Sequence, residues 1–449
     1  MASHSQKDSI SSSTDSNPGL MSDTDSIASY GLTSAVESTA LNKSVLEIIS
    51  NRTLSDADLH DQAKKHLQIL TRPSFESYNV PKWVARVPLP VDIDSHKFNM
   101  KNLFDAMYQT ASDLKLASGA RYVSAAICAC ATRAAEQPQE KQVEQLAAEL
   151  CKLGGTWVAY MLWPFIGNSK PPDDLVEHSD VATPTYDRTA SVMDEGNTAT
   201  RRGHFRTEVM KRDNYTCILT GVLDKSAPLH LRTGELSRVK LEAAHIMRRS
   251  VTVFRADNTD NAKRASLAST YDILKHYCEL DDKFAETMSQ MDGAQNGVLL
   301  DKYAHDAFDD FGFCFQAEEA ANTYKVKAWI PEKEISTVPI ASKITFKDHS
   351  QTLNTAPAAR RSGHAHSQPD DSIPLPSPQL LQLHAALAGV LNMSGAAEIL
   401  QVFQNPPGSD GPAVQSDYGD DFESEVIQYD GDKISVMRDL TGSVGRLAL

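Results

Sequence analysis

The chain has 449 residues, which is enough for two or three domains of about 150 residues and for a sizeable core. Its net charge of −15 argues against a protein that coats nucleic acid with its whole surface, so any contact with a polyanion must be local. Hydrophobic residues make up 41% and charged residues 23%, as in a globular protein with polar tails.

Cysteine usage and hydropathy predict an intracellular protein of the nucleus or cytoplasm, with no membrane association. The six cysteines form neither a disulfide framework nor a C-x-x-C pair, which favours a reducing compartment. The first residues lack the apolar stretch of a secretory signal. The longest apolar stretch, Trp157 to Gly167, is about half of what a bilayer needs and contains Pro164.

The N-terminal half predicts a tail, a helical region and a linker. Residues 1–43 are crowded with Ser, Thr and Asp, so they cannot bury enough apolar surface to offset the entropy of ordering, and we expect disorder. Apolar residues at spacings of three and four then predict a helical region over residues 44–165, whose role the sequence does not assign. Several prolines break both periodicities over residues 166–200, which predicts a linker.

Residues 201–347 have mixed periodicity and predict an α+β module. A short strand is expected from Asn296, and Asp301 stands where an N-cap would start a helix directly after it. The remaining expected elements are helices over residues 204–212 and 266–291, and strands over residues 217–220, 238–246, 311–316 and 324–330.

The C-terminal part predicts a second linker, one helix and a second tail. Residues 348–378 are rich in Ser, Pro, Ala and His. Residues 379–404 have the amphipathic spacing of a single helix. Residues 405–449 are acidic and rich in Gly, Asp and Ser, so we expect them to be disordered.

Three fragments lie in an order that suits cleavage of a phosphodiester. They are Leu241-Glu-Ala-Ala-His245-Ile, Asn296-Gly-Val-Leu-Leu and Asp301-Lys-Tyr-Ala-His305-Asp-Ala-Phe-Asp309. A histidine ending a strand, an asparagine opening another strand and a histidine early in a helix can converge on one divalent ion. Histidine also suits deprotonation of water, because its ordinary pKa is near neutrality. His305 and Asp309 are four residues apart and can chelate from one helix face.

These fragments, with Val209-Met-Lys-Arg-Asp-Asn-Tyr-Thr-Cys217-Ile-Leu-Thr-Gly221 before them, resemble the HNH endonuclease family and specifically its fungal-type branch. The resemblance implies a ββα-metal module (HNH or His-Me finger) that follows the helical N-terminal region. It also implies that His245 is the general base, that Asn296 pins the loop or orients that base, and that His305 is a metal ligand.

The chain departs from the family pattern at three places. Many relatives bind the metal through an Asp or His where this chain has Ala244, so three alternatives stay open. Either His305 and Asp309 hold the ion with waters and substrate phosphate, or Glu242 adds a carboxylate, or the site is weak or inactive. Asn296 lies 51 positions after His245, which implies an inserted helical lobe between the two strands. Thr220 stands where relatives have a second cysteine, which favours a buried packing thiol at Cys217 over half of a zinc site.

Local charge favours a nucleic-acid partner, and the family resemblance implies DNA more than RNA. Residues 201–264 hold fourteen Lys and Arg against seven Asp and Glu, although such a run can also be a merely solvated face. Arg248, Arg249 and Arg255 follow the predicted base, where substrate phosphates would pass.

The sequence therefore predicts a metal-dependent DNA endonuclease. Magnesium or manganese fits an oxygen-and-imidazole site best, and zinc or nickel is also compatible with it. Two alternatives from other classes stay open: an inactive HNH-fold module that binds nucleic acid or protein, and an interaction scaffold whose helical N-terminal region binds protein partners that the sequence does not identify.

Overall fold

The computed structural model describes residues 35–85, 98–166, 204–232, 238–248, 261–281, 292–353 and 372–404. Most of the predicted tails and linkers, together with Arg249 and Arg255, lie outside the described residues. Helices combine with small sheets, so the predicted α+β class is confirmed. The first helix begins at Ala35, inside the segment predicted as a tail.

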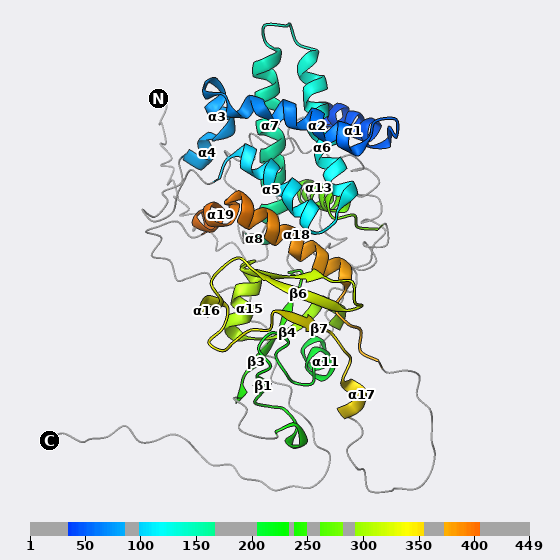
Figure 1. Ribbon diagram of the computed structural model, residues 1–449, viewed down its shortest axis with the longest axis vertical. Helices are drawn as coiled ribbons and strands as arrows, with labels where there is room; N and C mark the ends of the chain where they lie inside the picture. The colour runs from blue at the N-terminus through cyan, green and yellow to red at the C-terminus, as the bar shows by residue number, and fades with distance from the viewer. Residues whose placement is uncertain are drawn as a thin grey trace, which may run out of the picture. The chain divides into compact units, whose positions relative to one another are not determined.

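The N-terminal half is helical, with α6 (Ala117–Ala135) at its centre (Figure 1). This helix contacts α1, α2, α5 and α7, and its Ala-rich sequence lets these helices approach closely. A helix that is apolar on nearly all sides is expected in a core. The other elements of this half are α1 (Ala35–Ser50), α2 (Asp56–Leu67), η1 (Gln68–Thr71), η2 (Pro73–Phe75), α3 (Glu76–Asn79), α4 (Lys82–Ala85), α5 (Met100–Asp113), α7 (Gln142–Trp157), η3 (Val158–Leu162) and α8 (Trp163–Ile166).

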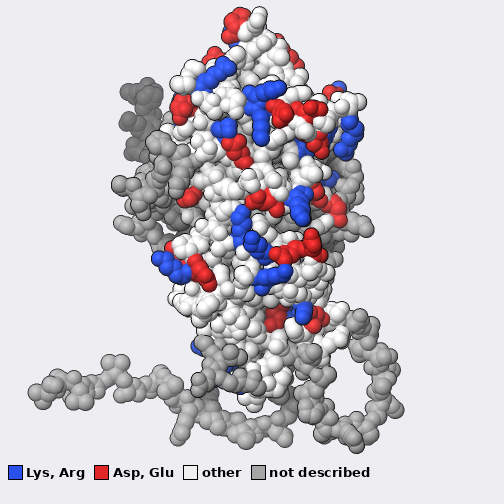
Figure 2. All heavy atoms as spheres, viewed as in Figure 1, with Lys and Arg blue, Asp and Glu red and all other residues white. Residues whose placement is uncertain are grey.

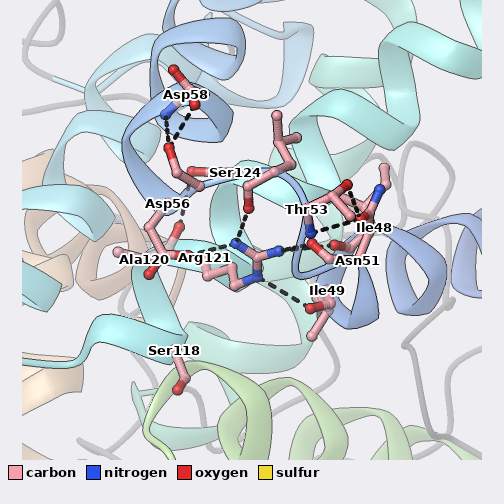
Figure 3. A network of polar contacts seen from close by, with 12 residues as sticks. Ile48, Ile49, Asn51, Thr53, Asp56, Asp58, Ser118, Ala120, Arg121 and Ser124 are labelled. Carbon is pink, nitrogen blue, oxygen red and sulfur yellow. Dashed lines mark hydrogen bonds and ion pairs between the residues drawn. The ribbon is translucent and has the colours of Figure 1, made fainter.

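A buried arginine joins the first two helices to α6 (Figure 3). The side chain of Arg121 is only 5% exposed, and every nitrogen of its guanidinium group donates to the protein. Several acceptors are carbonyls at the end of α1, where a helix leaves carbonyls without intrahelical partners. The acceptors are the backbone oxygens of Ile48, Ile49, Asn51 and Leu54 and the carboxylate of Asp56.

We expect Arg121→Met to lower the free energy of unfolding by about 3 kcal/mol, because it leaves buried carbonyls without donors. Asp56→Asn removes the formal ion pair only, and the Asp56 side chain is 64% exposed, so we expect a loss below about 1 kcal/mol. Urea unfolding followed by circular dichroism measures both changes. Equal losses in the two variants would contradict the role given to the carbonyl contacts.

The other half of the fold contains an antiparallel strand pair that leads directly into a helix. Strand β3 (Leu241–His245) pairs with β4 (Gly297–Asp301), with Leu241 opposite Asp301 and His245 opposite Gly297. Helix α15 (Lys302–Asp309) follows β4 without a loop. The Asp301 carboxylate accepts from the backbone N–H of Ala304, which confirms the predicted N-cap.

Smaller elements complete this half. A three-stranded antiparallel sheet has the order β5-β6-β7, and a short parallel pair is formed by β1 and β2. These elements are α11 (Phe205–Arg212), β1 (Leu223–Asp224), η4 (Leu229–Leu231), β2 (Arg238–Val239), α13 (Asn261–Tyr277), η5 (Ala294–Asn296), β5 (Phe313–Ala317), β6 (Thr323–Ala328), α16 (Glu332–Ile335), β7 (Lys343–Thr345) and α17 (Ser350–Leu353).

Two predictions for this half were wrong in detail. Residues 217–220 are not a strand but a tight turn, in which the N–H of Gly221 donates to the carbonyl of Cys217 and Gly221 adopts a φ of 71°. The helix predicted over residues 266–291 is α13, which lies in the insertion after His245 but ends at Tyr277. Glu279 has a φ of 57°, in the left-handed region that ends helices.

The C-terminal helix predicted over residues 379–404 is in fact a pair, α18 (Pro378–Ser394) and α19 (Ala396–Gln404). Gly395 separates them with a φ of 75°, and the chain bends by 92° there. Among the described residues no single helix is long and apolar enough to cross a bilayer, whereas this bent pair meets that test of length and composition when taken together. In the fold, α18 packs against both α5 and β5 (Figure 1).

Candidate functional site

His245 is the last residue of β3, and its ring lies flat against a phenylalanine from α11. The ring centroids of Phe205 and His245 are 4.1 Å apart and the planes differ by 6°. The backbone of His245 is fixed by its pairing with Gly297 in β4. The predicted base is therefore held both through its strand and through its imidazole face.

Asn296 is fully buried and secures the loop after His245. Its side-chain oxygen accepts from the N–H of Met247 at 2.9 Å, and its side-chain nitrogen donates to the carbonyl of Met247 at 3.0 Å. Its own carbonyl accepts from the N–H of Ile246 at 2.8 Å. A side-chain amide can match both backbone groups of one residue in this way, and few other side chains can.

His305 on α15 lies between two carboxylates. Its Nδ1 is 2.8 Å from Oε2 of Glu242, and its Nε2 is 3.7 Å from Oδ1 of Asp309. Burial lowers the pKa of His305, but the hydrogen bond to Glu242 and the charge of Asp309 outweigh it, so the pKa is raised overall. The same hydrogen bond lowers the pKa of Glu242.

The donor set around His305 suits two protein ligands rather than a closed cage. Among the described residues there is no group of three or more His, Cys, Asp or Glu side chains arranged to hold a metal ion. Glu242 and Asp309 face different nitrogens of one imidazole, so an ion at Nε2 would meet Asp309 and not Glu242. Magnesium commonly binds one or two protein ligands and keeps several waters, which this pair allows.

Strand alternation separates His245 from His305. Successive side chains of a strand point to opposite faces. The side chains of Glu242 and Ala244 therefore share one face of β3, and the side chain of His245 points to the opposite face. The face of Glu242 meets α15, whereas His245 meets α11. The two imidazoles therefore do not face each other across the hairpin.

Arg248 follows β3 and lies beside the C-terminal end of α15. Helix α15 runs back along the hairpin, so that His305 lies beside Glu242 and the end of the helix lies beside the loop after His245. The Arg248 side chain donates from Nη2 to the backbone carbonyl of Asp309 at 3.0 Å. This contact uses one of five guanidinium donors, and the side chain is half-buried.

Two buried charged side chains, Arg212 and Asp213, bind the backbone of β4 and of the residues just before it. The guanidinium group of Arg212 is fully buried and binds both carboxylate oxygens of Asp213, at 2.7 and 2.8 Å. It also donates to the carbonyls of Ala294 at 2.6 Å and Gly297 at 2.8 Å, on either side of Asn296. Asp213 in turn accepts from the N–H of Leu299 in β4 at 3.2 Å.

Cys217 is a buried thiol in contact with the start of α15. Its Sγ donates to Oδ2 of Asp301 at 3.6 Å, and Thr220 donates to the same oxygen at 3.1 Å. Burial raises the pKa of this thiol. The turn is thus tied to the N-cap of α15 by hydrogen bonds.

His384 supports the far end of α15 from α18. Its ring is buried, with its centroid 3.9 Å from that of Phe308 and 4.8 Å from that of Phe311. Its Nε2 lies 3.1 Å from the carbonyl oxygen of Phe308, so the neutral ring donates there. Burial lowers the pKa of His384 to about 4, which keeps the ring neutral at pH 7.

We expect His384 to make the fold sensitive to acid between pH 6.5 and 4. The unfolded chain binds a proton at this residue near pH 6.5 and the folded chain only near pH 4, so stability falls as the pH drops through this window. The full contribution is on the order of 3 kcal/mol. His384→Gln keeps a donor for the carbonyl and cannot titrate. Urea unfolding at several pH values should therefore give a flatter profile for the variant, and parallel profiles would contradict the assignment.

Charge on the visible face does not form a basic stripe. Figure 2 shows acidic and basic side chains intermingled over the described residues. Of the three arginines predicted to contact phosphates, Arg248 is the one that lies among the described residues. Arg249 and Arg255 lie outside the described residues.

The side chains that support the site but lie outside the three fragments were not predicted from the sequence. Phe205 and Arg212 belong to a helix that was predicted without a role, and the adjacent Arg and Asp before Cys217 were the available signal. His384 had no signal, because its contact with Phe308 joins residues 76 positions apart.

A hairpin that leads into a helix, with a histidine ending its first strand and a buried asparagine opening its second, is the arrangement that the three fragments predicted. Residues 217–316 match the family model described as HNH endonuclease. The predicted resemblance to the HNH endonuclease family is therefore confirmed for this part of the chain, which is an HNH endonuclease domain, and the fungal-type branch stays a prediction. No curated protein and no solved structure matches the chain.

Proposed function

We propose that this protein is an endonuclease that hydrolyses phosphodiester bonds in DNA with the help of a divalent metal ion. The observation that carries the proposal is the family match, because residues 217–316 contain all the predicted catalytic and metal-binding residues, which are Glu242, His245, Asn296, His305 and Asp309. In this proposal β3, β4 and α15 form the ββα-metal module. The remaining support is the closeness of the loop after His245 to the end of α15, through Arg248.

His245 is the proposed general base, which takes a proton from the attacking water. Histidine is the residue type commonly used for this task, because an unperturbed imidazole titrates near neutral pH. Asn296 acts on this residue through the backbone, because it holds both polar groups of Met247 and the N–H of Ile246. The base then stays in one place relative to the phosphate.

His305 and Asp309 are the proposed ligands, through Nε2 and the carboxylate. Glu242 orients the histidine ligand: it accepts a hydrogen bond from Nδ1–H of His305 and so directs Nε2 of that ring outward. This differs from the predicted role of Glu242 as a third ligand. When bound, magnesium or manganese supplies positive charge to the phosphoryl and leaving oxygens, and zinc or nickel is also compatible with the donors.

Arg248 is the proposed phosphate contact at this end of the hairpin. One of its donors is committed to the carbonyl of Asp309, which fixes the guanidinium group beside the proposed ligands. The other donors can pair with phosphate oxygens in a fork. Binding through such contacts weakens as salt rises. Arg249 and Arg255 stay predicted contacts from the sequence.

Cleavage of supercoiled plasmid by the full chain tests the proposal. We expect nicked and linear products with Mg²⁺ or Mn²⁺, none with EDTA, and slower cleavage of an RNA of matching sequence. A chain that cuts no DNA with Mg²⁺, Mn²⁺, Zn²⁺ or Ni²⁺ is not this nuclease.

A second candidate is an inactive HNH-fold module that binds nucleic acid. The observation that favours it is Ala244, which stands where many relatives have a ligand, together with the two-ligand donor set. Salt-dependent retention of DNA without cleavage would favour this module. If the chain neither binds nor cleaves nucleic acid, the result would favour the interaction scaffold.

A further inference from the structure

Phe205 forms a ring stack with His245 that is nearly parallel. The 4.1 Å centroid distance and the 6° angle describe parallel stacking rather than an edge contact. The Phe205 side chain is buried, with 8% of the residue exposed, so the stack lies inside the fold. A phenyl ring carries no hydrogen-bonding group, so it restrains the imidazole without competing for its nitrogens.

The strand opposite His245 is shaped to admit this ring. Gly297 is the cross-strand partner of His245, and a Cβ on Gly297 would come within 2.7 Å of Cε2 and Cζ of Phe205. The same Cβ would meet Cγ2 of Val209 at 2.7 Å. Glycine at this position therefore lets α11 approach the hairpin closely enough for the rings to stack.

The helix that carries Phe205 cannot slide along the hairpin. Arg212, at the other end of α11, donates to the carbonyls of Ala294 and Gly297. Asp213 accepts from the N–H of Leu299. The first residue of α11 is thus fixed relative to β4, and through β4 to His245.

We infer that Phe205 is a positioning residue for His245, which fixes the plane of the imidazole so that it meets the attacking water in one orientation. The inference rests on the proposed function for the role of His245. It also extends the working site beyond the family-matched segment, because α11 precedes residue 217. Misplacement of a catalytic group by about 1 Å can cost on the order of a hundredfold in rate.

Kinetics of three variants test the effect on the reaction. We expect Phe205→Leu to lower kcat for plasmid cleavage by about 10- to 100-fold with KM nearly unchanged. Phe205→Tyr keeps the stack and should stay within about threefold of the wild type. Phe346→Leu makes the same change in another buried ring cluster, with Phe315 and Tyr324, and controls for general loss of packing. In a His245→Ala background, Phe205→Leu should have no further effect.

A readout without activity separates this inference from the proposed function. The ring protons of His245, assigned by their loss in His245→Ala, should show an NMR shift from the stacked phenyl ring. That shift should disappear in Phe205→Leu and persist in Phe205→Tyr and Phe346→Leu. An unchanged His245 signal in Phe205→Leu overturns the inference whether or not the wild type cuts DNA. If the wild type never cuts DNA, the positioning role is overturned together with the nuclease proposal. The NMR signal of His245 then decides separately whether the stack exists.

Discussion

Replacing His245 with alanine is expected to lower the rate of plasmid cleavage by about 10²- to 10⁴-fold, because the attacking water loses its base. Binding of the plasmid should persist, since Arg248 and the backbone hydrogen bonds of Asn296 do not involve the imidazole. Single-turnover cleavage, with gel-shift titration of the same preparation, measures both quantities.

His230→Ala is the matched control, because His230 is exposed and lies away from the hairpin in η4. It should cut at the wild-type rate. Cleavage by His245→Ala at the wild-type rate would remove His245 from the mechanism. The nuclease proposal would then need another base within reach of the proposed metal ligands.

Replacing Arg212 with methionine is expected to lower the free energy of unfolding by about 3–5 kcal/mol, because it leaves the Asp213 carboxylate buried without its ion-pair partner. Two carbonyls beside Asn296 also lose their donor. Burial raises the pKa of Asp213 even with Arg212 present, so the loss of the guanidinium group should force that carboxyl toward its neutral form.

A double variant distinguishes a buried pair from simple loss of packing. Arg212→Met with Asp213→Leu removes both charges, so it should be more stable than Arg212→Met alone. Arg206→Met, on the same helix but partly exposed, should cost less than about 1 kcal/mol. Urea unfolding compares the three. A double variant less stable than Arg212→Met would mean that Asp213 stabilises the fold without its partner.

The local parts of the site could be predicted from the sequence, because local chemistry fixes them. Asp301 caps the helix that carries His305 and Asp309, and the order of residue types around His245 and Asn296 identified the paired strands. The turn at Cys217 was misread as a strand, because its apolar residues have the composition of one and only the positive φ of Gly221 distinguishes it.

The parts that pattern could not predict depend on contacts between distant residues. Nothing in the spacing of Glu242 indicates that its carboxylate meets Nδ1 of His305. The stack of Phe205 on His245 depends on the space left by Gly297. The break between α18 and α19 had a signal in Gly395, but the apolar periodicity on both sides outweighed it.

The place of α18 also orders the events of synthesis. Asn392 donates to the carbonyl of Phe311, and His384 donates to that of Phe308, so the end of α15 receives its last supports from residues made some 80 positions later. A chain that ends before residue 372 lacks both of these supports for α15. Such a fragment is expected to lack the proposed nuclease activity.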